Sequence, residues 1–367
     1  MDTGARDFEE ALEEVTSGEP GVTAIERLLH ARGRELLLLV RRADEVRKEQ
    51  VGEVVTYVVN RNINFTNICV NNCRFCAFRR RLIDPDAFLL TLEEIERKVR
   101  EAVEFGATEI CLQGGIHPYL GLDYYVEILR AVRGVSEHLH IHAFSPQEIS
   151  SIADRENLTV EEVLKTLKRE GLGSMPGTAA EILSNRVRGI ICPNKIKTER
   201  WVEIVETAHQ LGIPTTATIM YGTVESARER AEHLLIIREI QKRTGGFTEF
   251  IPLPFVGTRT ELGKEVPNPS LTDHLRLHAV ARLVLGKYIR NLQASWVKLG
   301  PRGAQLMLLA GANDLGGVLL EENITREAGG RWGQCLPPER IIQLVLEIQR
   351  IPAQRSTLYE ILQLHQH

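Results

Sequence analysis

The sequence predicts an α/β protein built as a closed (β/α)8 barrel with a helical extension at its N-terminus. From about residue 51 onward, short apolar or β-branched runs alternate with stretches of helical periodicity, and loops rich in Gly, Pro, Asn or Ser separate them. This alternation is typical of parallel strands joined by crossover helices. Eight such runs fit a closed barrel better than an open doubly wound sheet.

Residues 1–50 are predicted to form the helical extension. Apolar positions such as Ile25, Leu28 and Leu36 recur among charged residues, and Gly, Glu, Pro and Gly at 18–21 interrupt the pattern. The barrel is expected over residues 51–340, and residues 341–367 are expected to form a C-terminal helix packed on it. The sequence contains no internal repeat or long Gly/Ser linker that would indicate a second independently folding domain.

The strands and crossover helices follow from the same periodicity. The eight expected strands are 54–65, 108–114, 139–145, 172–176, 215–222, 248–255, 292–297 and 314–320. The expected helices include 92–105, 123–135, 160–170, 199–211, 227–243 and 272–285. In such a barrel the reactive groups collect on the loops that follow the strands, and the polar clusters of this chain fall there.

Composition excludes several classes of function. The apolar content of 43% is enough for a large core, and the net charge of -4 is spread over interspersed acidic and basic residues, so no sustained positive field favours nucleic acid. The N-terminus lacks the pattern of a secretory signal. The longest early apolar run, 36–40, is far shorter than the roughly 20 residues that span a bilayer. We expect a soluble, cytoplasmic protein without a membrane segment.

Cysteine spacing points to metal chemistry. Six cysteines are too few for a disulfide scaffold, and Cys69, Cys73 and Cys76 crowd into a CxxxCxxC pattern directly after the first expected strand. Three thiolates on one tight loop can hold three irons of a [4Fe-4S] cubane, which leaves the fourth iron open. The amino and carboxylate groups of S-adenosylmethionine (SAM) can chelate an open iron, and electron transfer then releases a 5′-deoxyadenosyl radical. Phe75 would offer an aromatic face to the adenine.

Two other interpretations of the three cysteines remain open at this point. A zinc site could combine them with a histidine such as His117 or His142, although zinc sites usually pair cysteines as two CxxC knuckles. Alternatively, the three thiols bind nothing. The other three cysteines, Cys111, Cys192 and Cys335, stand alone and are expected to be structural.

The CxxxCxxC loop, with an aromatic residue before its last cysteine, resembles the signature of the radical SAM superfamily. The runs 62–67, 111–118, 140–146 and 173–181 resemble the branch that contains the deazaflavin and menaquinone enzymes. The runs 246–256, 295–301 and 311–317 are most similar to the deazaflavin (FO synthase) family. The resemblance extends from about residue 50 to the end and implies a TIM-type barrel of the radical SAM type.

The resemblance to the deazaflavin family implies a radical transferase of coenzyme F420 biosynthesis. The Cα–Cβ bond of L-tyrosine would break, and the 4-hydroxybenzyl group would add to 5-amino-6-(D-ribitylamino)uracil. A reducing donor of the flavodoxin or ferredoxin type is implied, and stable docking of the ring-closing FO synthase subunit 1 stays open. The alternatives are aminofutalosine synthase or dehypoxanthine futalosine cyclase of the menaquinone pathway, and a noncatalytic zinc-bound scaffold.

The same resemblance assigns further residues to the cofactor. Gln113, Gly114 and Gly115 end the second expected strand, where the superfamily usually carries Gly-Gly-Glu beside the methionyl group of SAM. Here Ile116 replaces the glutamate, so only backbone contacts carry over. A plain turn after the strand is the alternative for this run.

Three further side chains have a functional and a structural interpretation. Glu181 could bind the ribose hydroxyls or amino group of SAM, or complement a helix dipole. Glu225, in a run resembling the adenine-flanking GxIxGxxE element, could contact SAM or cap a helix. His142 is the expected catalytic residue because it shares a strand face with His140 near the strand's end, and a structural histidine is its alternative.

Overall fold

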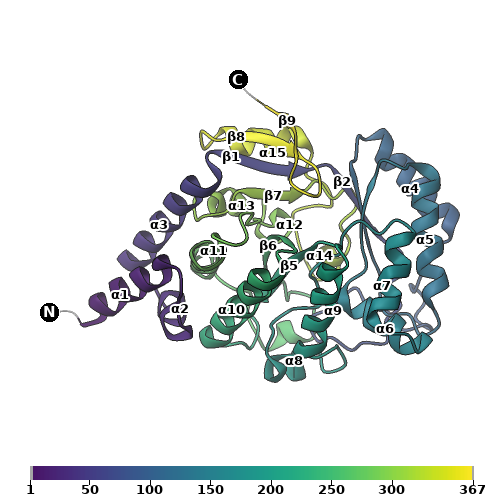
Figure 1. The fold of residues 1–367 in the computed structure, drawn as a ribbon, viewed down its shortest axis with the longest axis horizontal. Helices are drawn as coiled ribbons and strands as arrows, with labels where there is room; N and C mark the ends of the chain where they lie inside the picture. Colours follow the sequence, from purple (N-terminus) through teal and green to yellow (C-terminus); the bar gives the residue numbers. More distant parts are fainter. Residues whose placement is uncertain (1–2, 366–367) are drawn as a thin grey trace.

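The computed structural model describes residues 3–365 and confirms the predicted (β/α)8 barrel (Figure 1). Residues 1–2 and 366–367, at the ends of the first and last expected segments, lie outside the described residues. The elements in chain order are α1 (Thr3–Ser17), α2 (Val22–Leu29), α3 (Gly33–Val51), β1 (Val54–Val58), β2 (Asn60–Asn64), α4 (Leu92–Glu104), β3 (Glu109–Gln113), α5 (Leu122–Val135), β4 (His140–Ala143), α6 (Pro146–Glu156), α7 (Val160–Arg169), α8 (Asn185–Ile191), α9 (Thr198–Gln210), β5 (Thr215–Tyr221), α10 (Ala227–Thr244), β6 (Phe247–Pro254), η1 (Leu262–Lys264), α11 (Leu271–Leu285), α12 (Trp296–Leu299), α13 (Pro301–Leu308), β7 (Asp314–Gly317), α14 (Ile324–Glu327), α15 (Pro338–Leu346), β8 (Ile351–Arg355) and β9 (Ile361–Leu364).

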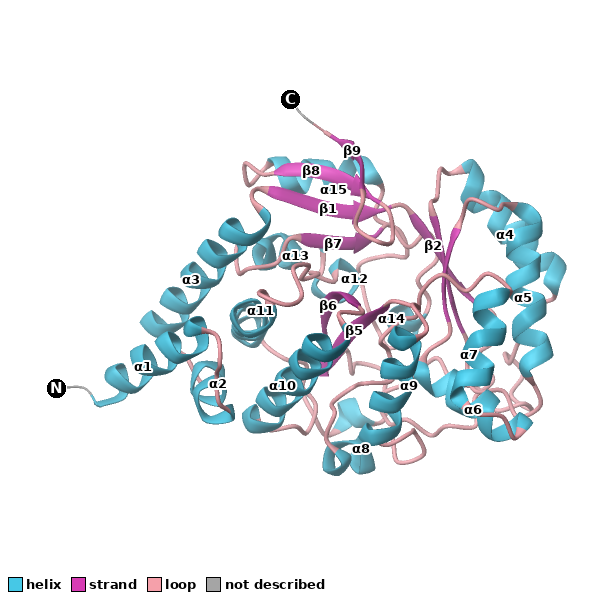
Figure 2. Ribbon diagram, in the orientation of Figure 1, coloured by secondary structure: helices cyan, strands magenta, loops and turns pink. Residues whose placement is uncertain are grey.

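Parallel pairing closes the barrel. Strand β1 pairs with β7, its continuation β2 pairs with β3, and β3 pairs with β4. Residues 174–175 bridge β4 to β5, and residues 292–293 bridge β6 to β7, so these two short segments supply the fourth and seventh strands. Figure 2 shows the cyan helices on the left, on the right and below the magenta strands, with β8 and β9 at the upper edge. All eight expected strand positions therefore take part in the closed sheet.

The crossover helices begin at sequence-encoded caps. Reciprocal capping boxes, in which a Ser or Thr and an acidic residue three positions later satisfy each other's backbone N–H groups, open α4, α6, α7, α10 and α11. The N-terminal helical extension packs against two helices of the barrel, with α2 on α10 and α3 on α11 (Figure 1). No described helix combines the length and apolar character that crossing a membrane requires.

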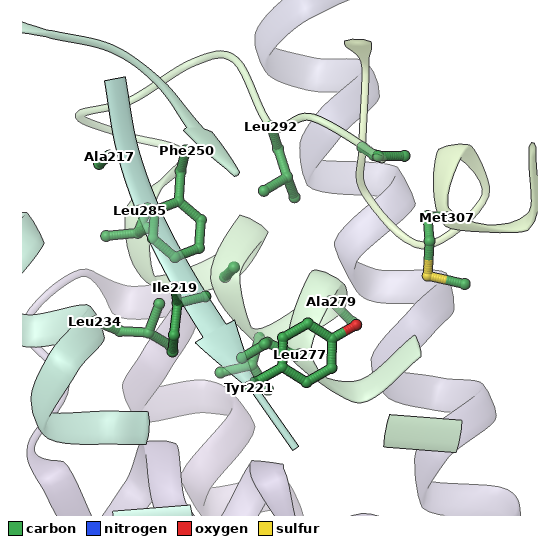
Figure 3. Packing of buried hydrophobic residues seen from close by; sticks show 14 of the residues in the cluster. Ala217, Ile219, Tyr221, Leu234, Phe250, Leu277, Ala279, Leu285, Leu292 and Met307 are labelled. Atoms are coloured by element: carbon green, nitrogen blue, oxygen red, sulfur yellow. The ribbon is translucent and has the colours of Figure 1, made fainter. Parts of the chain in front are cut away.

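The larger hydrophobic core lies between β5 and β6 and the helices that cover them. Figure 3 shows Ile219 of β5 and Phe250 of β6 among Leu234 of α10 and Leu277 of α11, and all four side chains are fully or almost fully buried. Burying apolar side chains of this size stabilises the fold by about 1.5–3 kcal/mol each. This packing holds the strand ends, and therefore their loops, in place.

The expected C-terminal helix over 341–367 is wrong. Helix α15 ends at Leu346, β8 pairs in parallel with β1, and β9 pairs antiparallel with β8. Pro352 cannot lie in a helix interior because it has no N–H group to donate and its ring clashes with the preceding turn. The sheet therefore extends past the expected barrel boundary at residue 340.

The last residue of β8 and the segment after it fill the N-terminal end of the barrel with a buried polar network. The Arg355 guanidinium donates from Nε to Asp314 Oδ2 at 2.6 Å, and Thr56 Oγ1 donates to the same oxygen at 2.5 Å. Tyr359 donates its hydroxyl to Glu249 at 2.8 Å, and its ring lies 3.9 Å from the Arg355 guanidinium. The loops that carry the cysteines lie at the opposite end of the strands.

Candidate active site

A cavity of about 240 Å³ opens where the loops at the C-terminal ends of the strands meet. Most of the residues expected at a cofactor site line it. They are Cys69, Cys73, Phe75, Cys76, Gln113, Gly114, Gly115 and Glu181. The structure thus brings together the cysteine loop, the end of β3 and the loop before α8, as expected for a barrel whose reactive groups follow the strands.

The cysteine loop is fixed by its backbone. The Cys69 N–H donates to Arg80 O at 3.0 Å, and the Cys76 N–H donates to Cys73 O at 3.1 Å. Burial raises the pKa of Cys69, and hydrogen bonds from the N–H groups of Ile116 and Asn71 lower it in part. Burial raises the pKa of Cys73 to about 12. Thiolate ligation at neutral pH therefore depends on a positively charged partner, such as iron.

Gly114 and Gly115 allow the end of β3 to approach this loop closely. A Cβ atom on Gly115 would lie 2.2 Å from Ile68 O, and one on Gly114 would lie 2.5 Å from the Phe65 ring. The Gly115 N–H also donates to Thr66 O at 2.9 Å. Both glycines are therefore required for packing against the cysteine loop, whatever their contact with a ligand.

Glu181 faces the cavity as half of an ion pair. Lys195 Nζ donates to Glu181 Oε1 at 2.6 Å and lies 5.3 Å from the centroid of the Phe75 ring. Burial alone would lower the pKa of Lys195, but the Glu181 charge raises it. Glu181 has a φ of 46° and precedes α8, so the interpretation as a helix-dipole partner is wrong. Such left-handed backbone in a non-glycine residue is often found at functional sites.

Glu148 also lines the cavity, although the sequence did not indicate it. Its Oε1 accepts from the Gly114 N–H at 3.1 Å, and its Oε2 accepts from the Ser145 N–H at 2.6 Å. Burial raises the pKa of Glu148 to about 7 although these hydrogen bonds lower it. Its sequence signal was a capping box with Ser145, which predicts a helix start but not the contact with β3.

Two buried polar atoms of residues at the cavity have no hydrogen-bond partner among the described residues. They are Asn71 Nδ2, inside the cysteine loop, and Thr178 Oγ1, three residues before Glu181. Buried polar groups in native proteins are nearly always satisfied, so an unpaired donor and hydroxyl beside a cavity indicate a polar ligand.

Glu225 does not reach the cavity. Its carboxylate accepts from the N–H groups of Gly222 at 2.6 Å and Thr223 at 2.8 Å, and it pairs with Arg230 at 2.7 Å. Helix α10 begins two residues later with its own cap, Ser226. Glu225 therefore closes the loop after β5, and neither a cofactor contact nor a helix cap describes it.

His142 also lies away from the cavity. Its Nδ1 shares a hydrogen bond with Ser174 Oγ at 2.7 Å, and His140 Nε2 contacts the same hydroxyl at 2.7 Å. Burial lowers the pKa of His142 to about 4, so the imidazole is neutral at neutral pH. The expected catalytic role required a place at the cavity, and the structure gives His142 a structural place between two strands.

The zinc interpretation has no support in the described side chains. Within residues 3–365, no three His, Cys, Asp or Glu side chains converge as ligands of a single metal ion. A cubane distributes its thiolate ligands over three different irons, which matches three cysteines that line a cavity.

Two family models match the chain, and together they cover most of it. The model of the Radical SAM superfamily matches residues 63–237, and the model of the CofH/MqnC C-terminal region matches residues 244–367. A 5-amino-6-(D-ribitylamino)uracil--L-tyrosine 4-hydroxyphenyl transferase from Archaeoglobus fulgidus is 56% identical over 320 residues, 87% of this chain and 92% of that relative. The transferase of the same name from Methanothermobacter thermautotrophicus is 50% identical over 335 residues, 90% of this chain and 91% of that relative.

Solved structures share the fold at low sequence identity. Methylornithine synthase superposes with a TM-score of 0.74 at 19% identity, covering 94% of this chain and 97% of that chain. The [FeFe]-hydrogenase maturase HydG from Carboxydothermus hydrogenoformans superposes with a TM-score of 0.75 at 19% identity, covering 97% and 81%. At these identities the likeness extends to the fold alone.

Proposed function

We propose that the cavity described above holds a [4Fe-4S] cluster and SAM, because the chain belongs to the radical SAM superfamily. Within that superfamily it belongs to the family of 5-amino-6-(D-ribitylamino)uracil–L-tyrosine 4-hydroxyphenyl transferases. The enzyme transfers the 4-hydroxyphenyl-bearing group of L-tyrosine to 5-amino-6-(D-ribitylamino)uracil. Identity of 50–56% over about nine tenths of both chains is the observation that carries this conclusion.

The residues at the cavity fit these two groups. Cys69, Cys73 and Cys76 would bind three irons, and the unpaired Asn71 amide is available to a polar neighbour of the cluster loop. When bound, the cluster and SAM supply the one-electron reduction that yields a 5′-deoxyadenosyl radical. The electron comes from a donor of the flavodoxin or ferredoxin type.

Side chains of the cavity would position SAM. The Phe75 ring offers an apolar face to the adenine, and the Glu181 carboxylate accepts hydrogen bonds from ribose hydroxyls or the SAM amino group. Lys195 already orients the Glu181 carboxylate. Thr178 Oγ1, which has no partner among the described residues, is a further hydrogen-bonding group on this loop.

The tyrosine Cα–Cβ bond can break when the radical lies on the amino nitrogen, because the bond is then β to the radical centre. Taking a hydrogen atom from that nitrogen requires a neutral amino group, so a nearby base has to accept a proton first. Glu148 is the proton acceptor that we propose, at Oε1. Its carboxylate lines the cavity, and a pKa of about 7 suits a base that takes a proton near neutral pH.

The decisive experiment is an anaerobic product assay with the reconstituted, reduced enzyme. With L-tyrosine and 5-amino-6-(D-ribitylamino)uracil together, mass spectrometry should detect the coupled 4-hydroxybenzyl product and 5′-deoxyadenosine. Conversion of the purine-nucleoside or enolpyruvate substrates of the menaquinone enzymes instead would contradict this assignment. If reconstitution gives no brown chromophore that absorbs at about 400 nm, the proposal that the cavity binds a [4Fe-4S] cluster is contradicted.

A further inference from the structure

Lys298 is a half-buried cation of the cavity wall that forms no ion pair with a described carboxylate. It belongs to the short helix α12, directly after the seventh barrel strand, and it lines the cavity. Its Nζ donates to Thr325 Oγ1 at 3.3 Å, and no carboxylate of the described residues lies within 4.0 Å of it. Lys195, by contrast, is neutralised by Glu181 at 2.6 Å in the same cavity.

The surroundings of Lys298 do not compensate its charge. Glu322, the acidic residue whose charge acts most on Lys298, accepts from the Thr325 N–H at 2.8 and 3.1 Å with its two oxygens. Burial lowers the pKa of Lys298, and the charges of Glu322 and Glu181 oppose that effect only in part. An ammonium that is partly removed from water and lacks a paired carboxylate favours a ligand that brings an anion.

The substrates differ in the anions that they carry. 5-Amino-6-(D-ribitylamino)uracil has hydroxyl, amino and ring amide groups but no carboxylate or phosphate, whereas L-tyrosine has an α-carboxylate. SAM also has a carboxylate, which belongs at the open iron of the cluster. Lys195 is already paired with Glu181 at 2.6 Å, so Lys298 is the lysine of this cavity that is available to a further carboxylate.

We propose that Lys298 binds the α-carboxylate of L-tyrosine and so positions the amino acid in the cavity. This inference rests on the proposed function. Apolar residues line the same cavity and would accept the phenol ring, namely Leu253 at the end of β6, Phe255 and Val256 after β6, and Ile324 and Ala328 in and after α14. One cation beside an apolar wall is the pattern that an aromatic amino acid requires.

The test is equilibrium binding of L-tyrosine and tyramine to the reconstituted holoenzyme with SAM and without reductant, so that no turnover occurs. Tyramine lacks only the carboxylate. In the Lys298→Gln variant, L-tyrosine affinity should fall roughly 10- to 100-fold, the range for losing one charge-assisted hydrogen bond, while tyramine affinity stays unchanged. Lys298→Arg keeps the charge and should retain a preference for L-tyrosine over tyramine.

Three controls make the result specific. Lys298→Gln should keep wild-type iron content and SAM affinity. Lys264→Gln, at an exposed lysine of η1, is the matched substitution and should bind both ligands as the wild type does. Arg79→Gln removes the other cavity cation without an ion pair among the described residues and should keep the preference for L-tyrosine.

Several outcomes would overturn the inference. These are an unchanged L-tyrosine affinity in Lys298→Gln, an equal loss for both ligands, a Lys298→Arg variant without preference, or a loss of preference in Arg79→Gln instead. If the wild-type holoenzyme itself does not bind L-tyrosine, the proposed function fails and this inference fails with it. The wild-type measurement therefore separates the two failures.

Discussion

Substitution of single side chains at the cavity tests the role proposed for each of them. Alanine at Cys69, Cys73 or Cys76 should abolish SAM cleavage, because two thiolates neither anchor a cubane nor define its open iron. Iron content and 5′-deoxyadenosine formation measure this loss. Cys111→Ala is the matched control, since Cys111 lies on β3 and does not line the cavity. Full iron content and turnover in any of the three variants would refute the ligand assignment.

Glu181→Gln tests the second cofactor contact. Replacing the carboxylate removes a charge-assisted acceptor and leaves Lys195 without its partner at 2.6 Å. We expect SAM to bind more weakly by about 1–3 kcal/mol while the cluster absorption stays intact. Anaerobic titration with SAM measures the effect. An unchanged affinity would return Glu181 to a purely structural role in the loop before α8.

At the scale of elements, the contact between β3 and the cysteine loop depends on Gly115. In Gly115→Ala the new Cβ would meet the Ile68 carbonyl oxygen at 2.2 Å, so the loop has to move. We expect reduced iron incorporation with the secondary structure retained, measured by iron analysis and circular dichroism. Gly134→Ala is the control, because a Cβ atom there meets nothing within 4 Å. Normal iron loading of Gly115→Ala would show that the loop tolerates the shift.

The start of α10 provides a test by pH. Hydrogen bonding from Arg186 lowers the pKa of Glu229 from 4.5 to about 2, although partial burial opposes this shift. The carboxylate therefore stabilises the fold fully above pH 4.5 and loses this contribution as the pH falls toward 2. Glu229→Gln should cost about 1–2 kcal/mol at pH 7, because it removes the charge-assisted hydrogen bonds from Arg186, while a glutamine can still form the capping box with Ser226.

Denaturant unfolding at pH 7, 5 and 3 measures this contribution. The difference between wild type and Glu229→Gln should be full at pH 7 and 5 and smaller at pH 3. Glu232→Gln, one turn further along α10 in an exposed pair with Arg228, is the control and should change stability by less than about 1 kcal/mol. A difference that stays constant down to pH 3 would contradict the assigned cause.

At the scale of the whole molecule, the chain after α15 closes the N-terminal end of the barrel. Arg355 donates to both oxygens of Asp314, at 2.6 and 3.1 Å, and both side chains are buried. Arg355→Met leaves a buried carboxylate unpaired and should destabilise the protein by about 3–5 kcal/mol. Arg302→Met, which breaks the exposed pair with Glu347, should cost less than about 1 kcal/mol. Equal unfolding midpoints for the two variants would show that the network contributes little.

The local features of this protein could be predicted from sequence, because they depend on neighbours within a few residues. Period-2 and period-3.6 hydrophobic patterns located all eight barrel strands and the main crossover helices. The spacing of Cys69, Cys73 and Cys76 was enough to indicate a cluster loop, since all three ligands lie on one segment. Phe75 lies inside the cysteine motif, Gln113 ends the second expected strand and Glu181 follows the fourth, so local position was enough to predict that they lie at the cavity, where the structure has them.

What only the tertiary structure decided depends on segments far apart in the chain. Lys195, Glu148 and Lys298 share one cavity with the cysteines because three different loops meet there, and no local pattern marks such a meeting. Glu225 and His142 looked functional in sequence, but nearby backbone groups and the Ser174 hydroxyl satisfy them away from the cavity. The C-terminal strand β8 also forms because β1, about 300 residues earlier in the chain, offers a free edge for pairing. A local sequence pattern cannot indicate such a distant partner.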